Sequence, residues 1–158
     1  MDQPDEILKY EISVPMSADA ELVAARAVEQ IAANMRFDTR AIQQIRLALI
    51  EACINAMEHS DSDERTVHLT MMAQRDRLLV LVRDFGRGFD PLAVPEPMIQ
   101  QKLSRMGNKR GWGLMLIRRM MDEVVYEDVE VGTSLRMVKY LDPEGADAVT
   151  PRQDDGTQ

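Results

Sequence analysis

Three chemically capable side chains recur one helical turn apart in the stretch from Arg46 to Ser60. Glu51, Asn55 and His59 are four residues apart, so on an α-helix they form a stripe with steps of about 6 Å along the axis. A carboxylate one turn from an amide can hold a cation and a water or hydroxyl together. The competing interpretation is a plain solvated polar face, which is what most such stripes are.

The surroundings of this stripe favour a chemical role. Apolar residues recur with three- and four-residue spacing on the other side of the same helix, namely Ile42, Ile45, Leu49, Cys53, Ala56 and Met57. Leu47, Ile50 and Ile54 flank the stripe, so its side of the helix is also partly apolar. An asparagine inside a helix competes for backbone hydrogen bonds, which indicates that the side chain of Asn55 has a task.

A second candidate motif, Asp84-Phe85-Gly86-Arg87-Gly88, follows an apolar run from Leu78 to Val82. An acidic residue at the end of a strand can accept a hydrogen bond from a ligand amino group, and glycines let the backbone approach that ligand. The pattern is weak alone, because acidic turns with glycine are common. Its Asp-Phe-Gly letters do not indicate a eukaryotic-type protein kinase, since the His-Arg-Asp loop and the Val-Ala-Ile-Lys strand are absent from the sequence.

A third motif, Lys109-Arg110-Gly111-Trp112-Gly113, precedes an apolar helix expected from Leu114 to Val124. Free amide groups at a helix start, the positive end of the helix dipole and two adjacent cations together favour phosphate binding. A flexible basic loop is the alternative. The sequence has no Walker A motif, and neither glycine pair completes a dinucleotide-binding fingerprint.

Composition limits the function classes. The chain has 158 residues, 45% hydrophobic and 29% charged, which is typical of one globular domain. Its net charge of −8 argues against direct nucleic-acid binding and against an anionic membrane surface. Cys53 is the single cysteine, so an internal disulfide is excluded, as is typical of the cytoplasm. We expect a cytoplasmic protein, because no apolar run reaches the roughly 18 residues of a membrane span and no signal peptide is evident.

Hydrophobic periodicity predicts the elements that position these motifs. Strands are expected over 7–14, 66–73, 78–82, 124–131 and 134–141, with the run at 78–82 buried on both faces. Helices are expected from a Ser17 cap to about Met35, from a Thr39 cap through the stripe, and over 114–124. A long irregular segment from Asp84 to about Gln100 and a short helix near 99–106 complete the prediction.

This order of elements predicts an α+β, two-layer α/β sandwich. The sheet is expected to be mixed and mostly antiparallel, with the helices on one face. From Asp142 onward the sequence has almost no large apolar residues, which predicts a disordered acidic tail over 142–158.

The motifs gain specificity from their order, which is Glu51-x-x-x-Asn55, Asp84-x-Gly86-x-Gly88, Gly111-x-Gly113 and Gly132-Thr133. This series resembles the ATP-binding motifs of the GHKL superfamily, which holds gyrase, histidine kinases and MutL and uses the Bergerat ATP-binding fold. The chain length and the lack of a dimerisation or phosphoacceptor domain most resemble the anti-sigma factor serine/threonine protein kinases. The resemblance covers residues 5–141, which we expect to form a histidine-kinase-like ATPase domain.

The resemblance implies a role for each motif. Glu51 would be the catalytic general base and Asn55 would bind the Mg²⁺ that bridges the ATP phosphates. Asp84 would receive the adenine amino group, and His59 would only close the site. The remaining ATP-binding positions implied are Gly86 and Gly88 around the adenine pocket, Thr133 near the adenine, and Lys109, Arg110, Gly111 and Gly113 in a lid over the phosphates.

The resemblance further implies an anti-sigma factor that is also an ATP-dependent serine kinase. Its partners would be a sigma factor and a small antagonist protein phosphorylated on Ser or Thr, and a homodimer is favoured. Three alternatives stay open at this point. They are a non-catalytic, nucleotide-dependent protein-binding module, a stand-alone catalytic domain of a histidine kinase, and a purely structural domain.

Overall fold

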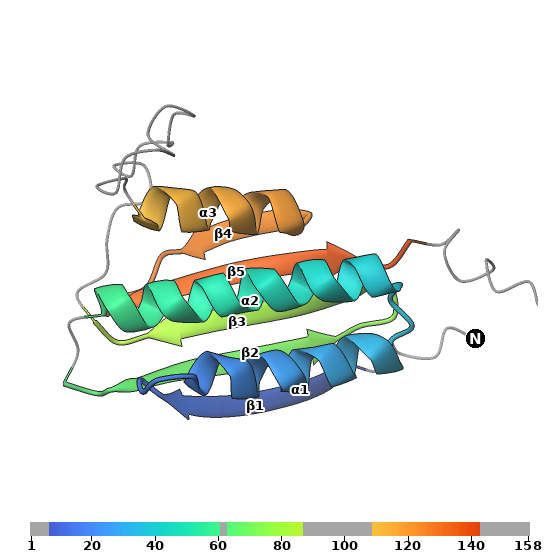
Figure 1. Ribbon diagram of the computed structural model, residues 1–158. Helices are drawn as coiled ribbons and strands as arrows, with labels where there is room; N and C mark the ends of the chain where they lie inside the picture. The colour runs from blue at the N-terminus through green and yellow to red at the C-terminus, as the bar shows by residue number, and fades with distance from the viewer. Residues whose placement is uncertain (1–6, 61–62, 87–108, 143–158) are drawn as a thin grey trace, which may run out of the picture.

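The described part of the protein folds into two layers, a five-stranded sheet and three helices that cover one of its faces (Figure 1). The computed structural model describes residues 7–60, 63–86 and 109–142. In chain order the elements are β1 (Leu8–Pro15), α1 (Ala20–Asn34), α2 (Thr39–His59), β2 (Thr66–Ala73), β3 (Arg77–Asp84), α3 (Lys109–Met120), β4 (Glu123–Glu127) and β5 (Thr133–Tyr140). This confirms the predicted α+β architecture and the order of its elements.

The sheet order is β1-β2-β3-β5-β4. All four strand pairs within the described ranges are antiparallel, so the sheet is fully antiparallel there rather than mixed. The chain leaves β3, forms α3 above the sheet, continues to the edge strand β4, and returns as β5 between β4 and β3. The end of β3 and the start of β5 thereby become neighbours.

Helix α2 lies over the sheet between α1 and α3 (Figure 1). Its buried residues recur every three or four positions and are Ile45, Ala48, Leu49, Ala52, Cys53 and Ala56, which confirms the apolar face predicted from the sequence. Ile42 and Met57 are half-buried and pack against this core. Burial raises the pKa of the Cys53 thiol to about 12, so Cys53 is a packing residue rather than a nucleophile.

The starts of the first two helices differ from the prediction. Asp38 caps α2, because its Oδ1 accepts a hydrogen bond from the Ala41 amide at 2.7 Å, and Thr39 is already helical. Asp19 precedes α1 with a left-handed φ of 64° and no side-chain cap. Ser17 contributes only its carbonyl, which accepts from the Ala20 amide at 3.3 Å. The predicted caps were therefore wrong by one or two residues, because Ser, Thr and Asp neighbours compete for the same position.

Burial alternates along β2 and β3. Leu78, Val80 and Val82 face the helices and are buried, whereas Leu79 and Leu81 lie half-buried on the opposite face. The prediction that this run is buried on both faces was wrong, because no described element covers the second face of the sheet. We call that surface the open face.

The last two predicted strands are confirmed as β4 and β5, and β4 is shorter than predicted. Helix α3 begins at Lys109 rather than at Leu114. The predicted irregular segment beyond Gly86, the short helix near 99–106 and the tail from residue 143 lie outside the described residues. None of the described helices combines the length and apolarity needed to cross a membrane.

Two leucines of α2 give a matched test of this arrangement. Leu49 is fully buried, whereas Leu47 is 43% exposed. We expect Leu49→Ala to lower the free energy of unfolding by about 3–5 kcal/mol, because it removes transfer energy and leaves a cavity. Leu47→Ala should cost less than about 1 kcal/mol. Urea unfolding followed by circular dichroism measures both, and equal losses would contradict the assigned faces of the helix.

Candidate functional site

The sequence motifs meet at one end of the molecule. The end of α2, the end of β3, the start of α3 and the start of β5 all lie at the left of Figure 1. Chain direction alone explains part of this arrangement, since β3 and β5 are antiparallel and Asp84 pairs in register with Thr133. The motifs at Asp84, at Gly111-Gly113 and at Gly132-Thr133 thus lie at ends of regular elements. These ends and the last turns of α2 surround a common space.

Asp84 is the fixed acidic group of the site. Strand alternation points it toward the helices, on the same side as Val82, and it is only 4% exposed. Its Oδ1 accepts a hydrogen bond from the Gly86 amide at 2.9 Å, and its Oδ2 accepts from the Thr133 hydroxyl. These two donors hold the carboxylate in one orientation, in which its remaining acceptor capacity suits a ligand amino group.

Gly132 allows Asp84 and Thr133 to meet. Its φ is +74°, a left-handed conformation, and a Cβ built on it would lie 2.0 Å from the Asp84 carbonyl oxygen and 2.7 Å from the Phe85 Cα. Only glycine permits this backbone approach. Gly132 belongs to the Gly132-Thr133 motif but is not among the predicted site residues. Its position directly before Thr133 is the signal that could have identified it.

Glu51 and Asn55 face the start of α3. A Cβ built on Gly113 would lie 2.9 Å from Asn55 Nδ2, 3.2 Å from Asn55 Oδ1 and 3.1 Å from Glu51 Oε2. The glycine therefore lets the helix backbone approach both polar side chains, which belong to a different helix. Asn55 Nδ2 is buried and has no hydrogen-bond partner among the residues that the structure describes. A buried donor of this kind calls for a ligand oxygen or a water.

Electrostatics distinguish Glu51 from ordinary surface carboxylates. Burial raises the pKa of Glu51, and the negative charge of Glu58 raises it further. The group is therefore a stronger base than a free carboxylate. The amide oxygen of Asn55, one helical turn away, is a hard oxygen ligand of the kind that Mg²⁺ prefers. Over the described ranges no three His, Cys, Asp or Glu residues are grouped to hold a metal, so an ion here would depend on Asn55 and on ligand oxygens.

The other predicted site residues have these positions. Gly86 lies beside Asp84, and Gly111 is buried in the first turn of α3. Lys109 and Arg110 begin α3, and Gly88 lies outside the described residues. His59 is the last residue of α2, and its Nε2 lies 4.0 Å from Glu58 Oε2.

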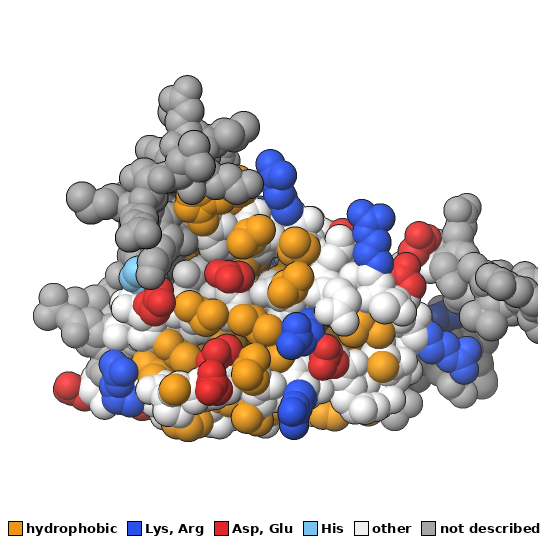
Figure 2. All heavy atoms as spheres, viewed as in Figure 1, with side chains coloured by type: hydrophobic (Ala, Val, Ile, Leu, Met, Phe, Trp, Pro, Cys, Tyr) orange, Lys and Arg blue, Asp and Glu red, His pale blue; other side chains and the backbone are white. Residues whose placement is uncertain are grey.

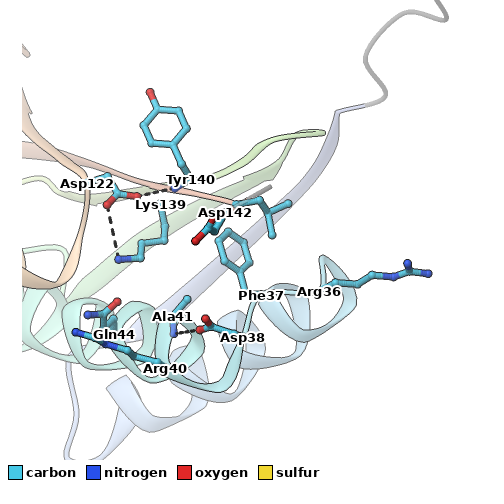
Figure 3. Close-up of a pocket in the computed structure, with 11 residues that line it drawn as sticks. Arg36, Phe37, Asp38, Arg40, Ala41, Gln44, Asp122, Lys139, Tyr140 and Asp142 are labelled. Atoms are coloured by element: carbon cyan, nitrogen blue, oxygen red, sulfur yellow. Dashed lines mark hydrogen bonds and ion pairs between the residues drawn. The ribbon is translucent and has the colours of Figure 1, made fainter. Parts of the chain in front are cut away.

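A separate hollow of about 300 Å³ lies where α2 begins and β5 ends, at the opposite end of these two elements (Figure 3). It contains none of the motif residues. Its charged lining residues are Arg36, Asp38, Arg40, Asp122, Lys139 and Asp142, so both signs of charge are present in equal number. The candidate site is therefore identified by the chemistry of its side chains and not by this hollow. It is the site built by α2, β3, α3 and β5.

The two-layer fold and the order of its motifs define an ATP-binding protein of the GHKL type. Residues 16–139 match the family described as the histidine kinase-like ATPase domain. Because this match spans most of the length of the chain, the chain belongs to that family.

Two curated relatives are both named serine-protein kinase RsbW. The protein from Halalkalibacterium halodurans is 30% identical over 148 residues, which cover 92% of this chain and 89% of the relative. The protein from Bacillus subtilis is 27% identical over 150 residues, which cover 87% and 88%.

Among solved structures, the chain resembles one of the RsbU and RsbW domains of a Mycobacterium tuberculosis protein. The TM-score is 0.62 at 16% identity, with 85% of this chain and 32% of the other covered. This likeness shows the fold alone, and this protein spans about a third of the chain in that structure.

Gly113 offers a test that separates the site from the fold. We expect Gly113→Ala to weaken ATP binding at least tenfold, about 1.4 kcal/mol, because the added methyl group displaces Glu51 and Asn55. Stability should stay unchanged or rise by up to about 1 kcal/mol, since alanine favours the helix. Calorimetric titration with ATP and thermal unfolding measure the two effects.

Gly132→Ala is the contrasting control. Its methyl group would meet backbone rather than flexible side-chain ends, so this variant should lose stability as well as ATP binding. If Gly113→Ala binds ATP as the unmodified chain does, the candidate site is misplaced.

Proposed function

We propose that the chain is an ATP-dependent serine protein kinase that also acts as an anti-sigma factor in a partner-switching pathway. The observation that carries the kinase proposal is the juxtaposition of Glu51 and Asn55 with the glycine at the start of α3. A general base and an oxygen ligand beside a helix start are the parts that phosphoryl transfer needs. The names of the relatives support the same activity.

ATP binding is assigned to the rest of the site. Asp84 accepts the adenine amino group, with Gly86 and Gly88 shaping the pocket and Thr133 fixing the carboxylate through its hydroxyl. Lys109, Arg110, Gly111 and Gly113 supply cations and backbone amides at the start of α3 for the phosphates. Specificity for adenine follows from the acceptor character of Asp84, because guanine presents a carbonyl oxygen where adenine has its amino group.

Asn55 is the proposed ligand of Mg²⁺, which when bound neutralises charge on the phosphates. The buried Nδ2 of the same side chain, which has no hydrogen-bond partner among the described residues, would donate to a phosphate oxygen while Oδ1 holds the ion. The amide oxygen of Asn55 fits this ion, and the remaining ligands would come from phosphate and water, as Mg²⁺ commonly keeps them.

Glu51 is the proposed general base. It takes the proton from the hydroxyl of the substrate serine while that oxygen attacks the γ-phosphorus of ATP, and the bond to the β,γ-bridging oxygen breaks. Its raised pKa gives it more proton affinity than a solvated carboxylate. Because Glu51 belongs to the rigid middle of α2, its position relative to Asn55 is fixed by the helix.

The proposed partners are a sigma factor that the protein sequesters and a small antagonist protein that it phosphorylates on Ser or Thr. The net charge of −8 suits a basic partner surface. We further propose a homodimer and a cytoplasmic location. A pull-down with the purified chain in Mg·ATP and in Mg·ADP would identify the antagonist by its nucleotide-dependent capture.

The kinase proposal is tested at Glu51. We expect Glu51→Gln to retain ATP binding and to slow phosphorylation of the captured antagonist by about 100-fold to 10,000-fold, the usual worth of a general base. Transfer of the γ-phosphoryl group from labelled ATP measures the rate. Undiminished transfer would refute the assigned base, and a phosphoprotein that loses its label in acid would indicate phosphohistidine in place of phosphoserine.

The pH dependence tests the surroundings of Glu51. The base acts only when deprotonated, so phosphorylation should fall as the pH drops through the raised pKa of Glu51. Glu58→Gln removes a charge that raises this pKa, and the acid limb of the rate profile should then move to lower pH. Glu130→Gln, an exposed carboxylate on the loop between β4 and β5, is the control. An unmoved acid limb in Glu58→Gln would exclude Glu51 as the titrating group.

A further inference from the structure

A second group of reactive side chains lies outside the candidate site, on the open face of the sheet. Ser13 Oγ in β1 lies 3.0 Å from His68 Nδ1 in β2. The other ring nitrogen, His68 Nε2, lies 2.7 Å from Glu64 Oε1. The three residues thus form a chain of hydroxyl, imidazole and carboxylate, which the proposed kinase function leaves unexplained.

Strand register produces this chain. Ser13 and His68 are opposed residues of β1 and β2, and His68 alternates with the buried Val67 and Leu69, so it projects from the open face. The Met16 amide donates to the Arg65 carbonyl. By the alternation of an antiparallel ladder, Ser13 and His68 then form a non-hydrogen-bonded pair, in which opposed side chains approach most closely.

The same alternation directs the backbone of Ser13 outward. β1 is an edge strand, so the amide N–H of Ser13 points away from β2 and has no partner strand among the described residues. In serine nucleophiles of known mechanism, the amide of the nucleophile itself is one of the donors that stabilise the oxyanion. Ser13 therefore carries a hydroxyl beside an imidazole nitrogen and an amide donor that faces no strand of the described residues.

The imidazole of His68 is held in a fixed orientation. The ring meets Phe85 edge to face, with centroids 5.3 Å apart and an interplanar angle of 79°. Phe85 is in turn covered by the Arg83 guanidinium at 4.7 Å. The tautomer that donates from Nε2 to Glu64 leaves Nδ1 free to accept the Ser13 proton. A nucleophile, a base and a group that orients the base are the elements of nucleophilic catalysis.

We propose that Ser13 is an activated nucleophile that accepts acyl groups from activated carboxylic esters. Ser13 Oγ attacks the carbonyl carbon, and its proton passes to His68 Nδ1. The Glu64 carboxylate stabilises the resulting imidazolium, and the Ser13 amide donates to the oxyanion. The ester C–O bond then breaks, and the leaving group departs with the bonding electrons and the proton from Nδ1. The products are an acyl ester on Ser13 and the free alcohol.

The proposal is tested with p-nitrophenyl acetate and the full chain. We expect release of nitrophenolate together with an acetyl group on the peptide that contains Ser13, located by mass spectrometry. Ser13→Ala should abolish this acetylation. His68→Gln should slow it by about 100-fold or more, the typical contribution of a general base, and Glu64→Gln should slow it to a smaller degree.

Ser134→Ala is the matched control. Ser134 lies in register with Arg83 on the same open face, and its hydroxyl donates directly to Glu127 at 3.2 Å without an intervening imidazole. This variant should be acetylated at Ser13 at the unmodified rate. ATP binding by each variant, measured separately, shows that it is folded.

Two outcomes would overturn the proposal. One is acetylation of lysines and the N-terminus alone, with Ser13 unmodified. The other is acetylation of Ser13 at an undiminished rate in folded His68→Gln, which would show that the imidazole does not act as the base. The kinase proposal does not depend on either result, because its test uses Glu51 on the other side of the sheet.

Discussion

The close approach of β3 and β5 at one end of the sheet is the constraint on which the candidate site depends. The backbone of Gly132 lies against the Asp84 carbonyl. A Cβ added to Gly132 would lie only 2.0 Å from the carbonyl oxygen of Asp84. The Thr133 hydroxyl then reaches the Asp84 carboxylate from the neighbouring strand. A buried carboxylate is costly to desolvate unless hydrogen bonds compensate. Asp84 is compensated by two donors, the Gly86 amide just after β3 and the Thr133 hydroxyl at the start of β5.

Helix α2 connects this acidic group with the rest of the chemistry. One face of the helix is packed against the sheet through residues such as Leu49 and Cys53. The other carries Glu51 and Asn55 toward Gly113 of α3. Because the packed face is fully buried, the polar face cannot rotate away without exposing the core. The positions of Glu51, the proposed general base, and Asn55, the proposed oxygen ligand, are therefore fixed by hydrophobic packing on the opposite side of the same helix.

The sheet has two chemically different faces. Its helical face is apolar and ends in the proposed ATP-binding motifs, whereas its open face carries half-buried apolar residues and polar rows such as Ser13, His68 and Arg83. Phe85 directly follows Asp84 in the chain, but its ring packs against His68 on the open face. The apolar run at Leu78 to Val82 could not reveal this difference, because the sequence of a strand does not state whether a second layer covers it.

The sequence by itself determined the properties that depend on the spacing of neighbouring residues and on the order of the motifs. Helical spacing predicted the stripe of Glu51 and Asn55 and the buried face of α2, and the order of the motifs predicted the family. Only the tertiary structure decided which residues meet. Gly113 against Asn55, Gly132 against Asp84, and Ser13 against His68 are pairs between 48 and 58 residues apart by their numbers in the sequence. Such contacts arise from strand register and helix packing, which are properties of the whole chain rather than of any local pattern.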